Sequence, residues 1–390
     1  CTVTRLAERK ARQTARRLRR EQPHSTIVIV GCLADAVEQG LTRFDDADLL
    51  AGNSWKPRIA EVVDRVRAGA RGMLPTTARG SLREESSAGC QGRIRAVLKL
   101  QDGCSAACTY CRTTQVRGHP RSKPLGAAVT EARGLVEAGF PEIVLTGINL
   151  AQYTPPEGNL ADTVRELLSI DGLVRLRIAS INPSGVTDEL IDAFVADDRA
   201  CPHFHVPLQS GDDRILRRMA RGYTVSQYLD RVDATRTRLP HATFGTDLIV
   251  GFPGEDERAF VNTCRVVERV AYANLHVFRY SARPGTVAAT MPDPVPEAIR
   301  RERATELDSR WRSQLAEWLD NRVGTVDHVL GEERCDGLWR GHTSDYLTVH
   351  FTSEEEIPIG TVCAVRIDAI VEGHLEGTAL PGQPGNAVLG

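Results

Sequence analysis

Two hydrophobic patterns alternate through the middle of the chain. Short apolar, β-branched runs such as RAVLKL (95–100), EIVLTGI (142–148) and FGTDLIVG (244–251) are typical of buried strands. Between them, apolar residues recur at helical spacing, as in residues 124–139 and 255–270. This alternation predicts a parallel sheet with right-handed crossovers, closed into an incomplete or complete βα barrel with functional residues at the carboxyl ends of its strands. Further strand candidates are LVRLRIAS (173–180), HFHVPL (203–208) and NLHVFRY (274–280).

The pattern changes on both sides of this region. Residues 2–22 predict a strongly basic helix, and STIVIVGC (25–32) predicts a buried strand. Residues 76–93, rich in Gly, Ser and Thr, are typical of a linker. Residues 296–324 predict one long helix, and the turn-rich strands beyond it predict a small β-barrel. We expect an N-terminal α/β domain at 1–75, the linker at 76–93, the barrel domain at 94–322 and the β-barrel module at 323–385.

Composition places the protein among soluble, multidomain chains. It has 390 residues, 41% of them hydrophobic, which suits two or three domains. No apolar run approaches the roughly 18 residues of a membrane span, so we expect no membrane contact. The net charge of −2 provides no overall attraction to nucleic acid. Ten cysteines in a chain of this length favour a reducing, cytoplasmic compartment. Because the chain begins with Cys1 rather than Met, we expect an upstream portion to be missing.

Three cysteines stand close together in QDGCSAACTYC, in a loop just after the first barrel strand. Cys104, Cys108 and Cys111 are spaced by four and three residues. Packing alone seldom produces such a cluster. Structural zinc is one explanation, with His119 or a distant cysteine as the fourth ligand. The other is a [4Fe–4S] cluster on three thiolates, which leaves one iron open for a small molecule. The spacing by itself favours neither.

The surroundings of these cysteines resemble the radical S-adenosylmethionine (radical SAM) superfamily. The loop lies at the mouth of a predicted parallel barrel, and Tyr110 stands just before the third cysteine. The resemblance implies that Cys104, Cys108 and Cys111 are catalytic cluster ligands. It also implies that the open iron is chelated by the amino and carboxylate groups of SAM, which one electron cleaves to a 5′-deoxyadenosyl radical.

Further motifs, in order along nearly the whole chain, are similar to the methylthiotransferase family. The tail from Val323 onward is similar to the RNA-binding TRAM module of that family. The resemblance therefore implies a truncated N-terminal α/β domain, a radical SAM partial (β/α) barrel and a TRAM β-barrel. The motifs are CTVT (1–4), VGC (30–32), VRG (116–118), VLTGIN (144–149), CPHFHVPLQSG (201–211), DLIVGFPGE (247–255) and HVFRYSARPGT (276–286).

Several of these motifs most resemble one type within the family. That type adds a methylthio group to C2 of N6-threonylcarbamoyladenosine at position 37 of tRNA. The resemblance therefore implies three partners, the tRNA anticodon loop, an electron donor and a sulfur source. Alternatives within the family modify isopentenyladenosine in tRNA or a ribosomal-protein aspartate. A non-catalytic, zinc-bearing RNA-binding module is the alternative outside it. The basic helix at 2–22 is either a solvated surface or a contact for tRNA phosphates.

The family also carries a second, auxiliary [4Fe–4S] cluster on three cysteines of the N-terminal domain. The resemblance thus implies two clusters in the full-length protein. Cys1 and Cys32 match the second and third ligands, and the first would lie upstream of this chain. Without the resemblance, simple buried thiols would be the favoured explanation of both.

Six further residues are candidate SAM contacts near the barrel mouth. Gly147 would let SAM approach the backbone, and Gln209 could hydrogen-bond its carboxylate or ribose; turn formation and helix capping explain these residues as well. Asn182 lies in ASINP, where the family often has an acidic residue. The strand pair His203 and His205 is assigned to core packing. The candidate SAM contacts are Tyr110, Gly147, Asn149, Asn182, Gln209 and Ser210.

Overall fold

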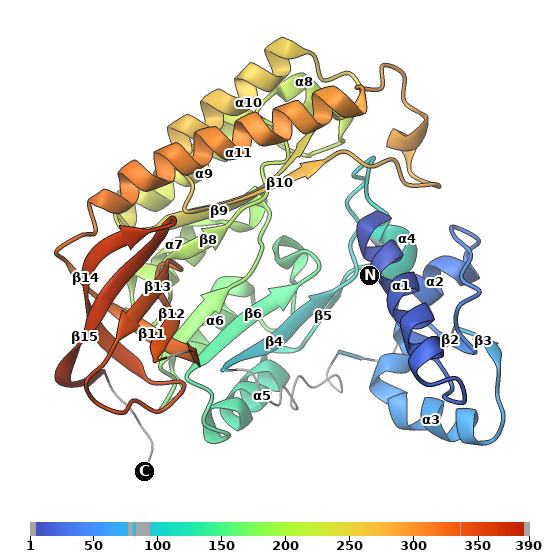
Figure 1. The fold of residues 1–390 in the computed structure, drawn as a ribbon, viewed down its shortest axis with the longest axis horizontal. Coiled ribbons are helices and arrows are strands. Elements are labelled where there is room, and N and C mark those ends of the chain that lie inside the picture. The colour runs from blue at the N-terminus through green and yellow to red at the C-terminus, as the bar shows by residue number, and fades with distance from the viewer. Residues whose placement is uncertain (1–4, 77–80, 83–93, 336, 386–390) are drawn as a thin grey trace.

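The computed structural model describes residues 5–76, 81–82, 94–335 and 337–385. Figure 1 shows an N-terminal α/β part, a central half-open barrel and a C-terminal closed barrel. The fold class expected from the apolar pattern and the resemblance is confirmed. The predicted linker lies mostly outside the described residues, and the proposed domain boundaries stay predictions.

A small parallel sheet with strand order β1-β2-β3 forms the N-terminal part. Only its first strand and first helix were expected. All three strands have three residues each, but β1 belongs to a run of four β-branched residues at 27–30, whereas β2 and β3 contain no β-branched residue. The elements are α1 (Arg5–Glu21), β1 (Val28–Val30), α2 (Cys32–Glu38), β2 (Leu49–Ala51), α3 (Ile59–Arg67) and β3 (Gly72–Leu74).

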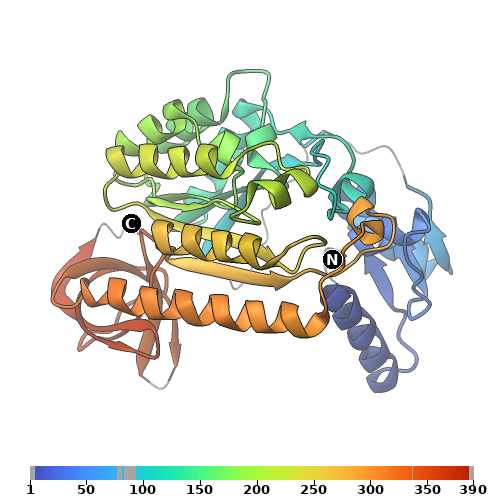
Figure 2. The same ribbon diagram turned by 90° about the horizontal axis from the view of Figure 1, so that it is seen from above.

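Six parallel strands form the central half barrel, in two groups, β4-β6-β7 and β8-β9-β10. A bridge between Leu176 and Ala200 joins the groups, and the short β5 adds an antiparallel edge beside β4. Helices cover the outside of the barrel (Figures 1 and 2). The elements are β4 (Arg95–Asp102), α4 (Thr113–Arg117), β5 (Arg121–Ser122), α5 (Leu125–Glu137), β6 (Glu142–Gly147), α6 (Leu160–Leu168), β7 (Arg175–Ile178), α7 (Asp188–Val195), β8 (His203–His205), α8 (Asp213–Arg218), α9 (Val225–Arg238), β9 (Thr243–Val250), α10 (Glu257–Val270) and β10 (Asn274–Arg279).

One long helix leads from the half barrel to the C-terminal module. It runs beside β10 and α10, as Figure 2 shows, and confirms the helix expected at 296–324. The module is a closed barrel with strand order β11-β12-β13-β15-β14, as expected for a TRAM-like domain. The elements are α11 (Glu297–Asp320), β11 (Val326–Cys335), β12 (Leu338–Thr343), β13 (Thr348–Thr352), β14 (Val362–Val371) and β15 (His374–Gly385).

The amino end of the half barrel is closed by the loop between β12 and β13. Glu142, at the start of β6, is buried and accepts a 2.7 Å hydrogen bond from Arg177 Nε. Arg177 also donates to the Ser344 carbonyl at 3.0 Å, and its guanidinium lies 4.7 Å from the centre of the Tyr346 ring. Since breaking a buried ion pair costs about 3–5 kcal/mol, this end is firmly held. The carboxyl ends of the strands are therefore left as the mouth of the barrel.

The N-terminal part docks beside that mouth through α1. Glu8 accepts hydrogen bonds of 2.6 Å from both Thr42 and Arg283, the latter in the segment after β10. Burial raises the pKa of Glu8, but these hydrogen bonds and the charge of Arg283 outweigh it and lower the pKa to about 2. Arg112, at the end of the cysteine loop, donates to the Leu41 carbonyl at 3.0 Å, which adds a second link.

The Glu8 contact predicts a pH-dependent stability. A carboxylate whose pKa is lowered on folding stabilises the fold above its unfolded pKa of about 4.3, and that contribution is lost as the pH falls toward 2. We expect Glu8→Gln to lower the apparent melting temperature by roughly 2–5 °C at pH 7 and by progressively less below pH 4. Differential scanning fluorimetry from pH 7 to 2.5 measures this, with the exposed Glu166→Gln as the control. An equal deficit at every pH would show that the charge of Glu8 is not responsible.

Candidate active site at the barrel mouth

The cysteine loop leaves β4 through a turn that requires glycine. Gly103 has φ +81°, and a Cβ at this position would lie 2.0 Å from the carbonyl oxygen of His119. The same turn lets the Cys104 N–H donate to the Gly118 carbonyl at 2.9 Å. The loop is thereby folded back against the segment after α4, with its three thiols at the mouth.

Every one of the three sulfur atoms accepts a hydrogen bond from a nearby N–H. Such donors stabilise thiolate ligands and the charge of an iron–sulfur cluster, so the donor set fits a cluster on these residues. Burial raises the pKa of the Cys111 thiol, and the hydrogen bonds from Thr113 oppose that effect. The donors are Ala106 N to Cys104 at 3.4 Å, Arg221 Nη1 to Cys108 at 3.2 Å and Thr113 N to Cys111 at 3.3 Å.

The two metal hypotheses require different spacings of the ligand sulfur atoms. Tetrahedral zinc, with Zn–S bonds of about 2.3 Å, brings its ligand sulfurs to roughly 3.8 Å from one another. Among the described residues, Cys104, Cys108 and Cys111 do not place their sulfurs all within 4.8 Å of one another. A cluster that binds each thiolate to a different iron accepts this wider spacing. His119, the candidate fourth zinc ligand, is exposed.

A chain of polar side chains connects two of the cysteines across the mouth. Asn149 Nδ2 lies 3.7 Å from Cys104 Sγ, and Asn149 Oδ1 accepts a 2.9 Å hydrogen bond from Asn182. Arg221 Nη2 donates to Asn182 Oδ1 at 2.6 Å, and the same guanidinium reaches Cys108. Groups after β4, β6, β7 and α8 therefore meet at one place, as the carboxyl ends of parallel strands should.

Gln101 organises this arrangement from within β4, and it was not anticipated. Its fully buried side chain accepts a 2.8 Å hydrogen bond from the Asn149 N–H and donates to the Gly103 carbonyl at 2.7 Å. Gly147 leaves room for it, because a Cβ there would lie 2.9 Å from the Gln101 side chain. The glycine is thus explained by packing, and its approach to SAM stays a prediction.

Three other candidates lie near the mouth but differ in their surroundings. Gln209 is a non-glycine residue at φ +67°, a strained conformation that often marks functional sites. Ser210 is buried and accepts a 3.3 Å hydrogen bond from the Asp212 N–H, so it acts as a turn residue. Tyr110 packs edge-on against Phe252, with ring centres 6.4 Å apart, and burial raises its pKa.

Cys32, at the start of α2, faces the barrel domain. It accepts hydrogen bonds from Arg117 Nε at 3.1 Å and from Asn53 Nδ2 at 3.3 Å. Arg117 also pairs with Asp102 at 3.2 Å, and Asp102 in turn accepts a bond from the Gly103 N–H. One arginine therefore links the Cys32 thiol to the start of the cysteine loop. Cys1, the other candidate auxiliary ligand, lies outside the described residues.

Comparison with known proteins identifies the family. Residues 98–267 match the model of the radical SAM superfamily. The chain is 33% identical over 377 residues to the threonylcarbamoyladenosine tRNA methylthiotransferase MtaB of Chlamydia pneumoniae, covering 97% of this chain and 87% of that protein. It is 33% identical over 378 residues to MtaB of Bacillus subtilis, covering 94% of this chain and 84% of that protein. This chain belongs to the radical SAM methylthiotransferase family.

A methylthiotransferase named for a different substrate is almost as similar. The tRNA-2-methylthio-N(6)-dimethylallyladenosine synthase of Pelotomaculum thermopropionicum is 32% identical over 393 residues, covering 97% of this chain and 87% of that protein. Among solved structures, the radical SAM methyltransferase TsrM of Kitasatospora setae has a TM-score of 0.54 at 14% identity, covering 72% of this chain and 60% of TsrM, which supports the fold alone.

Family membership confirms the transferase class and the two expected cofactors, a [4Fe–4S] cluster and SAM. The non-catalytic zinc module is not favoured. None of the described helices is both long and apolar enough to cross a membrane. Neither the comparisons nor the family model assigns individual residues, so the site residues stay predictions that the geometry supports.

The Gly103 turn predicts a specific loss of iron. Gly103→Ala should move the cysteine loop, since the added Cβ meets backbone and the residue keeps a positive φ, at a cost above about 1 kcal/mol. We expect less iron per chain after anaerobic reconstitution, measured colorimetrically. Gly126→Ala, on α5 with open space around it, is the control and should bind as much iron as the wild type. Full iron binding by Gly103→Ala would disprove the role of this turn.

Proposed function

We propose that this protein adds a methylthio group to C2 of N6-threonylcarbamoyladenosine at position 37 of tRNA. The observation that carries the proposal is the loop of three hydrogen-bonded cysteines at the mouth of a methylthiotransferase barrel. Relatives named MtaB support the threonylcarbamoyladenosine substrate. The similar relative named for dimethylallyladenosine supplies the main alternative.

Within this proposal, Cys104, Cys108 and Cys111 hold a [4Fe–4S] cluster with one open iron. A cluster held there would supply the electron for reductive cleavage of SAM, the source of the radical that activates the adenosine. Asn149 and Asn182 lie beside the cysteines and offer amide groups to the polar end of SAM. The remaining SAM contacts we propose are Tyr110, Gly147, Gln209 and Ser210.

We further propose that Cys32, together with Cys1, serves the auxiliary cluster of the family. Arg117 and Asn53 already direct N–H groups at Cys32 Sγ, which suits a thiolate ligand. The sulfur atom that is transferred must come from a separate sulfur source, and the electron from a reductant of the cytoplasm.

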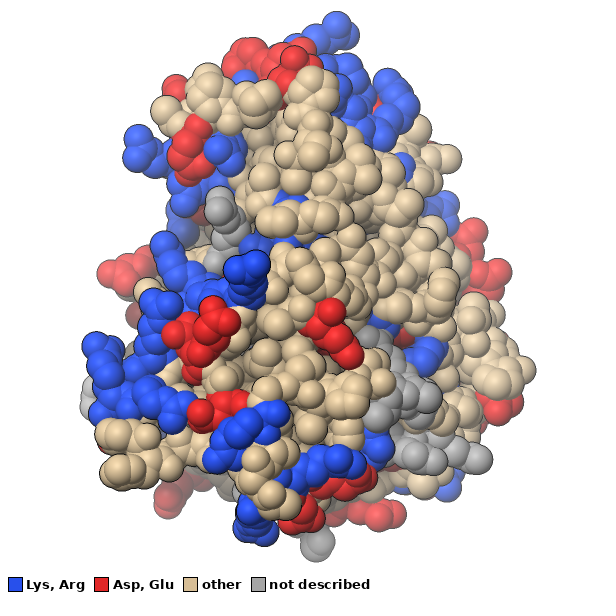
Figure 3. All heavy atoms as spheres, turned by 90° about the vertical axis from the view of Figure 1, so that its right-hand side faces the viewer, with Lys and Arg blue, Asp and Glu red and all other residues tan. Residues whose placement is uncertain are grey.

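The tRNA partner would meet basic side chains of the N-terminal part. Figure 3 looks at this end of the molecule, and Lys and Arg side chains gather along its left edge. Several of the α1 cations are neutralised by acidic neighbours, as Arg16 is by Asp46 at 2.9 Å. Local patches of this kind can bind phosphates although the whole chain is nearly neutral. The exposed cations of α1 are Arg9, Lys10, Arg16, Arg17 and Arg20.

Loss of one cluster ligand should abolish SAM cleavage. We expect Cys104→Ala to lower reductive formation of 5′-deoxyadenosine to background, because a cluster that loses one of its three thiolates is not retained at the mouth. Liquid chromatography of anaerobic reactions with dithionite measures this. The matched control is Cys335→Ala on β11, an exposed cysteine of the C-terminal barrel, which should keep wild-type cleavage. Cleavage by Cys104→Ala at the wild-type rate would remove the cysteine loop from the mechanism.

The substrate assignment is tested by the nucleosides of cellular tRNA. Deleting the gene should remove 2-methylthio-N6-threonylcarbamoyladenosine and leave its unthiolated precursor. Mass spectrometry of digested tRNA separates these from the isopentenyladenosine derivatives, which serve as the internal control. Loss of the 2-methylthio derivative of isopentenyladenosine instead would assign the alternative substrate.

A further inference from the structure

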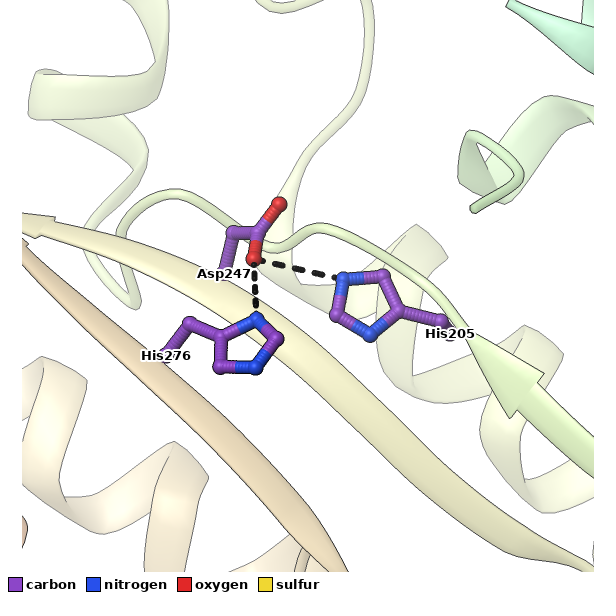
Figure 4. Close-up of side chains that lie close together, drawn as sticks. All are labelled: His205, Asp247 and His276. Carbon is purple, nitrogen blue, oxygen red and sulfur yellow. Dashed lines mark hydrogen bonds and ion pairs between the residues drawn. The ribbon is translucent and has the colours of Figure 1, made fainter. Parts of the chain in front are cut away.

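Three titratable side chains outside the cysteine site converge inside the half barrel. His205 ends β8, Asp247 lies in β9 and His276 lies in β10, and Figure 4 shows the three pointing toward one another. Asp247 and His276 are direct partners in the strand register. On β9, Leu248 and Val250 pack in the core that includes the outer helices, so Asp247 faces the barrel interior.

The two imidazoles share one carboxylate oxygen. His205 Nε2 lies 3.3 Å and His276 Nδ1 lies 3.1 Å from Asp247 Oδ1. Burial raises the pKa of Asp247, but the hydrogen bonds from both histidines outweigh it, so the pKa is lowered and Asp247 is ionised. The hydrogen bond to Asp247 raises the pKa of His276. Its side chain is 53% exposed, and in the described part of the chain no hydrogen bond is recorded at His276 Nε2.

The cluster lies between the Gln209 turn and the closed end of the half barrel. The Gln209 N–H donates to the Asp247 carbonyl at 2.9 Å, so the strained Gln209 turn lies just above the cluster. Below it, His203 packs against Tyr346, with ring centres 5.0 Å apart, in the closed end of the barrel. His203 and His205 are two residues apart on one strand, which separates the layers by about 7 Å. A base that reaches the cysteines from the mouth would rest on the layer of His205, Asp247 and His276.

We propose that His205, Asp247 and His276 bind the polar N6 substituent of the target adenosine, with His276 pairing with its carboxylate. The inference rests on the proposed function, because threonylcarbamoyl carries a carboxylate, a hydroxyl and N–H groups. The imidazolium form of His276 donates its Nδ1–H to Asp247 and its Nε2–H to the carboxylate of the substituent, and the second oxygen of Asp247 accepts from the hydroxyl or an N–H. A prenyl substituent offers none of these partners. It would displace water from His205, Asp247 and His276 without replacing the lost hydrogen bonds.

A divalent cation is the competing occupant of this cluster. The three ligand atoms all lie within 4.8 Å of one another, and two histidines with one carboxylate suit zinc or iron. In the structure, however, the same nitrogen atoms are turned to a single carboxylate oxygen as hydrogen-bond donors. A metal would require both protons to leave and would compete with this arrangement. The substituent would use the outward-facing nitrogen of His276 and the second oxygen of Asp247, and both hydrogen bonds to Asp247 Oδ1 stay in place.

Binding of anticodon stem-loops tests the proposal without requiring turnover. The wild type and the variants His276→Phe and His276→Gln are first reconstituted with the iron–sulfur cluster. Each is then titrated, by fluorescence anisotropy, with stem-loops that carry threonylcarbamoyladenosine, isopentenyladenosine or adenosine at position 37. The wild type should bind the threonylcarbamoyl loop at least about tenfold more tightly than the isopentenyl loop. His276→Phe should erase that preference, and His276→Gln should keep part of it. His241→Phe, at an exposed histidine away from the mouth, should behave as the wild type.

The outcomes separate this inference from the proposed function. If His276→Phe keeps the wild-type preference, then His205, Asp247 and His276 do not recognise the substituent. This conclusion holds even if cellular tRNA shows that the proposed modification is made. Equilibrium dialysis against zinc, with protein that already carries its iron–sulfur cluster, measures whether His205, Asp247 and His276 bind a metal ion. One zinc ion per chain bound by the wild type and lost in Asp247→Asn would make the cluster a metal site and overturn the proposal. Absence of the threonylcarbamoyl-dependent modification in cells would instead defeat the proposed function itself.

Discussion

The guanidinium of Arg221 connects the cysteine loop to the strand ends around it. It donates to Cys108 and to Asn182. Asn182 in turn donates to Asn149, whose side-chain nitrogen lies 3.7 Å from Cys104 Sγ. The loop itself has little regular structure, so its cysteines depend on such external partners for their positions. Because Arg221 is partly buried beside Tyr223, its charge is well placed to stabilise thiolate ligands and a bound anionic group. The rest of the site is arranged around this link.

The two ends of the half barrel have different tasks. At the amino end, buried Glu142 pairs with Arg177, and the arginines of β7, Arg175 and Arg177, donate to backbone carbonyls of the C-terminal barrel. At the carboxyl end, the N-terminal part docks through Glu8. Arg117 then contacts both Cys32 and Asp102, the residue at the end of β4 from which the cysteine loop continues. The fold therefore fixes both flanking parts relative to the mouth. This arrangement suits chemistry in which sulfur and radical must reach the same base.

Much of the architecture follows from local patterns, because strand and helix periodicity is a property of neighbouring residues. The strand ends that carry Asn149, Asn182 and Gln209 were predictable for that reason, as were the cysteines by their spacing. Residues that act through tertiary contacts were not. Gln101 is one polar residue in an apolar strand pattern, and Arg221 belongs to a run of arginines that predicted either a solvated surface or a contact for tRNA phosphates. His205 was assigned to packing, because its partners Asp247 and His276 lie on other strands and meet it only through strand register.

Electron paramagnetic resonance of the reduced, anaerobically reconstituted protein tests the central claim most directly. Cys104, Cys108 and Cys111 are the proposed ligands of a [4Fe–4S] cluster with one open iron. The spectrum should therefore show a reduced cluster whose g-values shift when SAM is added. A spectrum that SAM leaves unchanged, in protein that has bound its full iron, would mean that no open iron faces the mouth, and it would contradict the assignment.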